Sequence, residues 1–279
     1  MVGDSNRIPP AVDVSVPSVA RCYDYALGGK DNFEVDRAAV QQTEAAVPDS
    51  IVIARVNRSW HIRASRFLAE HAGVDQYLDL GAGLPTAENT HEVVHRVNPE
   101  ARVVYVDNDP TAAAHGRALL DDDHLVRYVE GDLTRPAEIL ADPDVRGHLD
   151  FDRPIALYQS ATLHHQPAEL DLPGIMRQYV DALAPGSFVV LSHFWDPGGE
   201  TSALVQQIHE SMRAHGIAGE FFRSREEIRA MLPGLELLPA GPDDTEGLVP
   251  LLDWWPDGPL LHDPGQVQRC ILGAVARKP

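Results

Sequence analysis

The sequence contains little cysteine: only Cys22 and Cys270 occur in 279 residues, almost at opposite ends of the chain. A single possible bridge in a chain of this length is a weak sign of secretion, and no cysteine spacing typical of a metal site occurs. The stretch MVGDSNRIPPAVDVSVP lacks the basic region and apolar core of a signal peptide. No segment approaches the roughly 20 apolar residues that span a bilayer. We therefore expect a cytoplasmic protein without a membrane anchor.

Positive charge is also scarce, since 23 lysines and arginines stand against 42 acidic residues and the formal net charge is −19. A surface this acidic repels phosphate backbones and anionic lipid, which disfavours nucleic acid and membrane surfaces as partners. It allows a small neutral or cationic substrate. Adaptation of the surface to solubility or salt is the alternative explanation of the same charge.

From Asp75 onward, short apolar segments alternate with segments of helical spacing. This alternation is typical of an α/β fold with parallel βαβ units and helices on both faces of the sheet. The predicted strands are 76–80, 102–107, 125–130, 153–159, 187–193, about 235–238 and 269–276. The predicted helices among them are 86–97, 110–121, 135–141, 170–184 and 201–215.

The N-terminal residues and the stretch 248–265 do not follow this alternating pattern. Residues 1–20 are predicted to form an extended arm, and apolar residues recur at helical intervals over about 31–46 and 49–72. The proline- and glycine-rich stretch 248–265 favours a long surface loop.

The segment LDLGAGLPT ends a predicted strand in a turn that contains Gly81 and Gly83. Glycine permits positive φ and a close approach of a ligand to the main chain. Gly81, Ala82 and Gly83 are therefore expected to line a ligand crevice beyond the strand ends. Asp107 ends the next strand at about the distance, roughly 20 residues, expected of a carboxylate that binds a ribose diol. A tight turn without a ligand is the alternative.

The residues around the turn favour one ligand over another. A nicotinamide-dependent dehydrogenase would continue to a third glycine that admits a pyrophosphate, whereas Pro85 and Thr86 follow here. Asp79 would repel a pyrophosphate and attract an ammonium group. S-adenosylmethionine has a ribose, a cationic amino-acid end and no phosphate, so it fits this turn better. In VEGDLT, Asp132 and Leu133 are expected beside the adenine, although Asp132 has an equal alternative as a helix cap.

The patch YDYALGGKDNFEVD precedes the sheet region and is predicted to cover the crevice. Tyr23 and Tyr25 offer aromatic faces to a sulfonium. Lys30 or Asn32 is expected to bind the carboxylate of the methionine moiety. Simple docking of the arm through its apolar side chains is the alternative.

Six segments together resemble one bacterial family of S-adenosylmethionine-dependent methyltransferases, once catalogued as a domain of unknown function: ARCYDYALGGKDNFEVDR, LDLGAGLPT, VVYVDNDP, DFDRPIAL, LAPGSFVVLSH and VARKP. The resemblance covers nearly the whole chain in order. It implies a class I methyltransferase (Rossmann-like) fold, with a seven-stranded, mostly parallel sheet, an antiparallel last strand and a helical N-terminal extension. It also implies a methionine-side loop of Gly81, Ala82, Gly83 and Leu84, a ribose site of Asp107 and Asn108, and an adenine site of Asp132 and Leu133.

The segment YQSATLHHQP matches the place where such enzymes meet the methyl group, and Ser160 and His165 are expected there. His164 or His193 is the candidate general base, unless alignment of the reactants alone suffices. Adjacent histidines rarely chelate one ion, so no metal is expected. Trp254 and Trp255 are predicted to wall the acceptor pocket, with loop packing as an equal alternative.

These observations predict a methyltransferase domain at residues 74–279 under an arm and helical lid at residues 1–73. The expected reaction is methyl transfer from S-adenosylmethionine to a small molecule that no motif identifies. The main alternative is a non-catalytic protein that binds S-adenosylmethionine or its demethylated product, S-adenosylhomocysteine. An NAD(P)-dependent oxidoreductase is less favoured.

Overall fold

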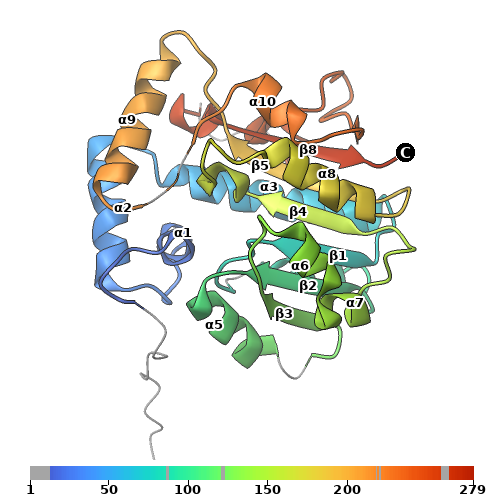
Figure 1. Cartoon of the computed structure of the whole chain (residues 1–279). Helices are drawn as coiled ribbons and strands as arrows, with labels where there is room; N and C mark the ends of the chain where they lie inside the picture. Colours follow the sequence, from blue (N-terminus) through green and yellow to red (C-terminus); the bar gives the residue numbers. More distant parts are fainter. Residues whose placement is uncertain (1–12, 86–87, 121–122, 218, 220, 259–263) are drawn as a thin grey trace, which may run out of the picture.

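The fold centres on one sheet of eight strands, ordered β3-β2-β1-β4-β5-β8-β6, with the short β7 also paired to β8 (Figure 1). The computed structural model describes residues 13–85, 88–120, 123–217, 219, 221–258 and 264–279. The strands are β1 (Gln76–Leu80), β2 (Arg102–Asp107), β3 (Val126–Glu130), β4 (Ala156–Ser160), β5 (Phe188–Phe194), β6 (Glu236–Leu237), β7 (Val249–Pro250) and β8 (Ile271–Arg277).

The sheet is mostly parallel. β1 pairs in parallel with β2 and β4, β2 with β3, and β4 with β5. β8 runs antiparallel to β5, β6 and β7. The predicted α/β class with an antiparallel last strand is confirmed, and β7 adds a short strand inside the stretch predicted as a loop. The strand order reverses between β1 and β4, which is where ligands bind in open α/β sheets.

Both faces of the sheet are covered, which explains why the strands read as nearly continuous apolar runs. All five residues of β1 and all seven of β5 are buried. Successive side chains alternate between two cores. Tyr77 packs in one core with Val103 and Tyr158, and Leu78 packs in the other with Val104.

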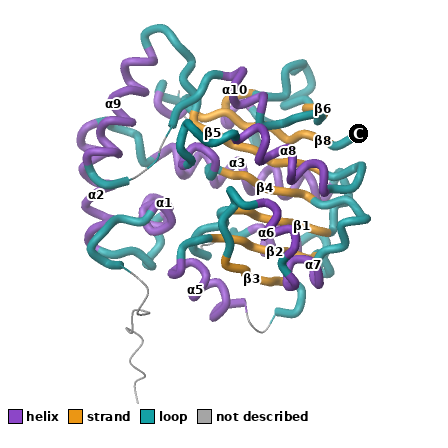
Figure 2. The backbone as a smooth tube through the Cα atoms, in the orientation of Figure 1, coloured by secondary structure: helices purple, strands orange, loops and turns teal. Residues whose placement is uncertain are grey.

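Ten helices are assigned among the described residues (Figure 2). They are α1 (Val19–Leu27), α2 (Glu34–Ala46), α3 (Val52–Glu70), α4 (Thr90–His95), α5 (Pro110–Leu120), α6 (Pro136–Ala141), α7 (Pro143–His148), α8 (Leu172–Ala182), α9 (Thr201–Ala214) and α10 (Arg225–Ala230). Three short 3₁₀ helices lie at Leu163–His165, Leu251–Asp253 and Val267–Arg269. The sequence analysis did not predict α1, α7 or α10. None of the described helices is long and apolar enough to cross a membrane.

Helices α1, α2 and α9 lie at one end of the sheet. In Figure 1, α1, α2 and α9 gather on the side toward which β4 points, so they stand beyond the carboxyl ends of the parallel strands. α3 instead packs on the sheet, because its fully buried Trp60, Ala64 and Leu68 belong to the same core as Tyr77. The boundary at residue 73 stays a prediction. The first twelve residues of the predicted arm, Thr86 and part of the predicted loop 248–265 lie outside the described residues.

Candidate active site

A cavity of about 420 Å³ opens at the carboxyl ends of β1, β2 and β4 and is walled by α1, α2, α3 and α9. Its position beside the point where the strand order reverses is the one that open α/β sheets use for ligands. Eleven of the residues predicted to form the site line this cavity: Tyr23, Asp79, Gly81, Ala82, Gly83, Asp107, Asn108, Leu133, Ser160, His164 and His165.

The turn after β1 requires its two glycines. Gly81 and Gly83 have φ of 71° and 69°, a region that side chains rarely adopt. The main-chain N–H of Gly81 donates to the carbonyl oxygen of Val106 over 2.7 Å. A β-carbon on Gly81 would lie 2.5 Å from Cγ2 of Thr162, whereas one on Gly83 would meet open space. The turn therefore keeps its main chain bare beside the cavity.

Asp107 ends β2 and is only 8% exposed. Its carboxylate accepts from the N–H of Gly83 over 2.7 Å and from the N–H of Asp109 over 2.8 Å. Burial raises the pKa of Asp107, and these hydrogen bonds oppose that shift. A carboxylate has about four acceptor positions, so Asp107 can hold the turn and also accept from a ligand hydroxyl.

Asp79 is a second buried carboxylate below the turn. It accepts from Oγ1 of Thr90 over 2.7 Å, and the same hydroxyl lies 2.8 Å from Nε2 of His61. Burial raises the pKa of Asp79 to about 6, although Thr90 and the charge of Arg58 lower it. Burial also lowers the pKa of His61 to about 3, so this imidazole is neutral at pH 7. A buried carboxylate of this kind is stabilised by a nearby cation.

Arg58 is a cavity residue that the sequence reading missed. It is the only lysine or arginine among the described residues that line the cavity. Its guanidinium lies 5.8 Å from the ring centroid of Tyr23, so a cation already approaches the aromatic ring predicted to face the sulfonium. Asn57, Arg58 and His61 share one face of α3, and polar residues at this helical spacing were the signal that could have revealed them.

Asn57 connects the N-terminal helices to the sheet. Its Nδ2 donates to Oη of Tyr23 over 3.0 Å and to Oγ of Ser160 over 3.3 Å. Its Oδ1 accepts from Oγ of Ser192 over 2.6 Å. The hydroxyl of Tyr23 also donates to the carbonyl oxygen of Ala54 over 3.2 Å. The sequence reading missed Asn57, which links the residues on both sides of the cavity.

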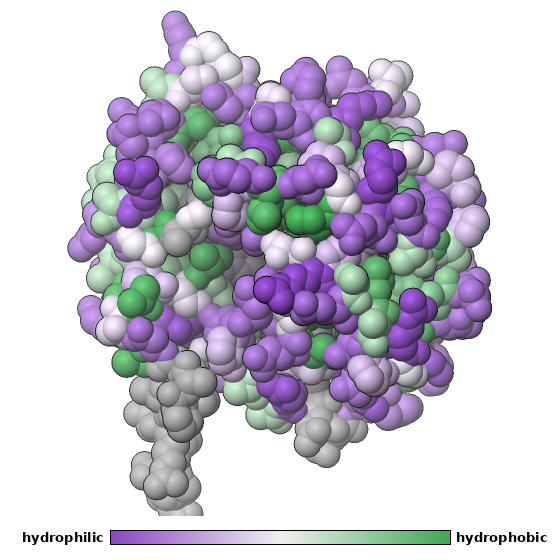
Figure 3. All heavy atoms as spheres, viewed as in Figure 1, coloured by the Kyte–Doolittle hydropathy of each residue, from purple (hydrophilic) through white to green (hydrophobic). Residues whose placement is uncertain are grey.

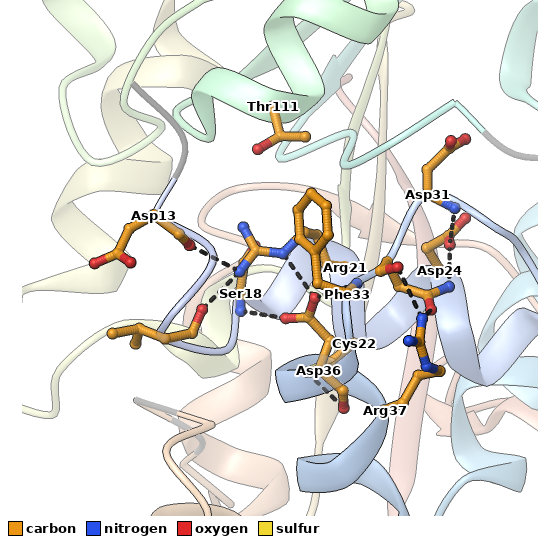
Figure 4. A network of polar contacts seen from close by, with 12 residues as sticks. Asp13, Ser18, Arg21, Cys22, Asp24, Asp31, Phe33, Asp36, Arg37 and Thr111 are labelled. Carbon is orange, nitrogen blue, oxygen red and sulfur yellow. Dashed lines mark hydrogen bonds and ion pairs between the residues drawn. The ribbon is translucent and has the colours of Figure 1, made fainter. Parts of the chain in front are cut away.

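A buried ion pair joins α1 to α2 (Figure 4). Nε of Arg21 donates to Oδ2 of Asp36 over 2.8 Å, and both side chains are buried. Asp36 also accepts from the N–H groups of Ser18 and Phe33, over 3.0 and 2.8 Å. Ser18 Oγ donates in turn to Asp109. This chain of contacts ties α1 to α2 and to the loop after β2.

Three residues predicted on the arm do not reach the cavity, so their expected contacts with the cofactor are not supported. Tyr25 lies on α1 and its Oη accepts from Nε2 of Gln41 over 2.8 Å. Lys30 is exposed to solvent. Asn32 donates to Oδ2 of Asp24 over 2.8 Å and stabilises the loop between α1 and α2.

Two residues near the predicted cofactor loops also lie outside the cavity lining. Leu84 is buried in the core instead of lining the methionine side. The carboxylate of Asp132 accepts from the N–H and the hydroxyl of Thr134, over 2.8 and 2.7 Å. Its bonds therefore hold a local turn, and α6 has Arg135, not Asp132, at its N-cap. Leu133 does line the cavity.

His164 and His165 border the cavity as neutral rings. His164 stacks on Phe194, with ring centroids 3.8 Å apart, and its Nδ1 accepts from the N–H of Phe194 over 3.3 Å. This bond places the proton of the neutral ring on Nε2, which then donates and cannot take up a proton. Burial lowers the pKa of His164 well below its usual value and that of His165 to about 4. The structure therefore argues against His164 as a general base.

His193, the other candidate base, points away from the cavity. Successive side chains of β5 alternate between the two faces, so Ser192 meets Asn57 while His193 faces the other side. Nε2 of His193 accepts from Nη1 of Arg223 over 2.9 Å. Burial lowers the pKa of His193 to about 3. The position and burial of His193 therefore do not support its predicted catalytic role.

The tryptophans predicted to wall the acceptor pocket lie elsewhere. Trp254 is fully buried and packs edge-on against Trp60 and Phe67, with centroids 6.2 and 5.7 Å apart. Trp255 is 41% exposed and its Nε1 donates to the carbonyl oxygen of Pro239 over 2.7 Å. Loop packing, the alternative prediction, describes Trp255, whereas Trp254 packs in the core.

Comparison with known proteins shows the family to which this chain belongs. Residues 5–279 match the family described as S-adenosyl methyltransferase. The solved structure of a Thermobifida fusca protein, provisionally named a methyltransferase, is 39% identical, covers 98% of this chain and 99% of its own, and superposes with a TM-score of 0.88. A DUF574 family protein from Streptomyces avermitilis is 35% identical, with coverage of 96% and 99% and a TM-score of 0.86. No curated protein matches the chain.

The cavity has the chemistry that the cofactor of this family needs. Bare main chain at Gly81 and Gly83 admits close approach, and the buried carboxylates of Asp79 and Asp107 suit an ammonium and a ribose diol. The predicted fold, family and cofactor are confirmed. The chain belongs to the S-adenosyl methyltransferase family, which has the class I methyltransferase fold and uses S-adenosylmethionine.

Proposed function

We propose that this chain transfers a methyl group from S-adenosylmethionine to a small-molecule acceptor inside the cavity. One observation carries the proposal: a single cavity borders both Asp79 and Asp107, on the cofactor side, and Ser160 and His165, at the end of β4. The bound cofactor would supply a methyl group on a sulfonium; an acceptor lone pair would attack the methyl carbon in line, and S-adenosylhomocysteine would leave. Side-by-side placement of two reactants contributes much of the rate in such a reaction.

Charge suggests which residues would bind each part of the cofactor. Asp107, with Asn108 beside it, would hold the ribose hydroxyls, and Leu133 would contact the adenine. The amino-acid end of the cofactor carries both charges, so Asp79 would meet its ammonium and Arg58 its carboxylate. Arg58 thereby takes the role that the sequence reading gave to Lys30 or Asn32.

The acceptor side is assigned to positioning rather than to proton removal. Burial keeps His164 and His165 neutral, and Nδ1 of His164 is already occupied by the N–H of Phe194. His164 can donate through Nε2, and Ser160 offers a hydroxyl held by Asn57. The acceptor would therefore arrive with an available lone pair and release any proton to water.

The N-terminal helices would serve as the cover of this site. Tyr23 on α1 lines the cavity, and the contacts of Arg21 and Ser18 hold α1 against α2 and the loop after β2. Exclusion of water from the reacting atoms is a common task of such covers. The buried thiols of Cys22 and Cys270 agree with action in a reducing cytoplasm.

The test separates an enzyme from a non-catalytic binding protein. The full chain is titrated with S-adenosylmethionine by calorimetry and then incubated with the methyl-tritiated cofactor and a panel of small-molecule acceptors. An enzyme binds the cofactor and labels an acceptor, and His164→Ala slows that labelling about tenfold or more while cofactor affinity stays within about threefold. Tight cofactor binding without labelled product favours a sensor, and absence of cofactor binding contradicts both.

A further inference from the structure

The cavity has two chemically different walls. The charged lining residues Arg58, Asp79, Asp107 and Asp109 all belong to α3 or to the ends of β1 and β2. A second wall comes from α1, α2, α9 and the residues next to them. Its described lining residues include no lysine, arginine, aspartate or glutamate. The side chains that form its apolar surface include Cys22, Val40, Ile51, Ile208, Met212 and Ile217.

The hydroxyls on this apolar wall already have partners. Thr43 Oγ1 donates to the carbonyl oxygen of Ala39 over 3.1 Å, within its own helix. Ser50 Oγ donates to Oε2 of Glu44 over 3.0 Å, and Ser18 Oγ donates to Asp109. An anionic group buried against this wall would lose its water without gaining a hydrogen-bond donor from these hydroxyls, because each already donates elsewhere. An apolar group would be favoured there.

The outer surface of the molecule is polar, in contrast to this apolar wall. Figure 3 shows a face that is mainly hydrophilic, with apolar side chains in small patches. The chain carries a formal net charge of −19, which repels anionic molecules before they reach the cavity. An extended apolar wall inside such a surface marks a ligand site.

We propose that the acceptor is an uncharged, largely apolar molecule whose body lies against the wall formed by α1, α2 and α9. Its nucleophilic atom would lie near Ser160 and His165. This inference rests on the proposed function. As the acceptor lone pair forms its bond to the methyl carbon, the carbon–sulfur bond breaks with its electron pair left on sulfur, and the methylated acceptor gives its proton to bulk water when the product leaves the cavity.

Two matched probes test the proposal: 2-naphthol and 6-hydroxynaphthalene-2-sulfonate, which differ by one negative charge. Each is titrated by calorimetry into the full chain saturated with S-adenosylhomocysteine. We expect 2-naphthol to bind at least about tenfold more tightly. Equal affinity, a preference for the sulfonate, or binding of neither probe overturns the inference. Failure of S-adenosylhomocysteine itself to bind would instead contradict the proposed function.

Variants of α9 locate the probe on this wall. Met212→Glu should weaken 2-naphthol about tenfold or more, whereas Gln207→Glu, which adds the same charge on an exposed position of α9, should not. Met212→Lys should shift the preference toward the sulfonate. S-adenosylhomocysteine affinity within about threefold of the original confirms an intact cofactor side. If Met212→Lys binds both probes as the original chain does, the acceptor body lies elsewhere and the proposal fails.

Discussion

The main-chain N–H of Gly83 donates a hydrogen bond of 2.7 Å to Oδ2 of Asp107, which joins the turn after β1 directly to the end of β2. The residue predicted to bind the ribose therefore also sets the shape of the glycine turn. Loss of this carboxylate would remove a ligand contact and also leave a main-chain donor without its partner.

Asp107→Ala should weaken S-adenosylmethionine binding by about 2–4 kcal/mol, because a charge-assisted pair of hydrogen bonds is lost. The control is Asp132→Ala, whose carboxylate contacts Thr134 and Arg135 within the local turn and lies outside the cavity lining. It should change the dissociation constant less than about threefold. Calorimetry on both variants measures the difference. Equal losses in the two variants would mean that Asp132 contacts the adenine after all.

Gly81→Ala should destabilise the protein more than Gly83→Ala. Both positions have positive φ, which costs an L residue roughly 1–2 kcal/mol. Only at Gly81 does the new β-carbon also meet Cγ2 of Thr162, at 2.5 Å. Thermal unfolding of the two variants measures the difference. Thr162→Ser removes that methyl group, so the double variant Gly81→Ala/Thr162→Ser should recover part of the loss. No recovery would show that the backbone conformation alone is limiting.

Asp79 makes stability depend on pH. Its pKa rises from 3.8 to about 6 on folding because it is buried. The folded state therefore holds this proton more tightly than the unfolded chain, and stability from this group falls as pH rises from about 4 to 6. The full penalty, about 3 kcal/mol, is present above pH 6. Asp79→Asn should gain stability relative to the original chain over this pH range, as measured by denaturant unfolding without ligand. A constant difference from pH 4 to pH 7 would contradict the raised pKa.

Asp36→Ala should loosen α1 and α2. The substitution leaves the buried guanidinium of Arg21 without its carboxylate, and breaking such a pair typically costs 3–5 kcal/mol. We expect faster hydrogen exchange of the α1 amides and weaker cofactor binding. Glu34→Ala is the control, since the exposed Glu34 pairs with Arg37 at the surface and such pairs contribute about 1 kcal/mol or less. Unchanged exchange in α1 after Asp36→Ala would show that other contacts hold the cover.

Arg58→Met should weaken S-adenosylmethionine about tenfold or more, because it removes the proposed partner of the carboxylate. It should leave 5′-methylthioadenosine, which lacks the amino-acid end, within about threefold. Arg55→Met is the control on the same helix, since Arg55 is exposed and its Nε donates to the carbonyl oxygen of Ala26. Calorimetry with both ligands decides the assignment. An equal loss for both ligands would place Arg58 at the nucleoside instead.

The sheet and the cofactor side were predictable because their signals are local. Apart from the two-residue β6 and β7, each strand is a short, mostly apolar run, and the turn after β1 shows its glycines directly in the sequence. The distance from Gly83 to Asp107 follows from the length of one βαβ unit. These features depend on neighbouring residues along the chain, so a pattern of a few residues specifies them.

The rest of the site depends on tertiary packing. Asn57 and Arg58 lie in a helix whose apolar spacing indicated only core packing, and their place beside the strand ends follows from how α3 crosses the sheet. His193 was a candidate base near the end of β5, but a shift of one residue along a strand reverses the face to which a side chain points. Trp254 lies in a proline-rich stretch typical of surface loops, yet Trp60 and Phe67 of α3 bury it.

The apolar wall of the cavity joins segments far apart in the chain, since α2 ends at Ala46 and α9 begins at Thr201. During synthesis, α1 and α2 leave the ribosome long before α9 exists to cover Val40 and Cys22. Contacts of such long sequence separation form late, and apolar surface that waits for them is prone to aggregation. This wall of the cavity is therefore completed near the end of folding, and a nascent chain that stops before α9 would expose its apolar lining to other proteins.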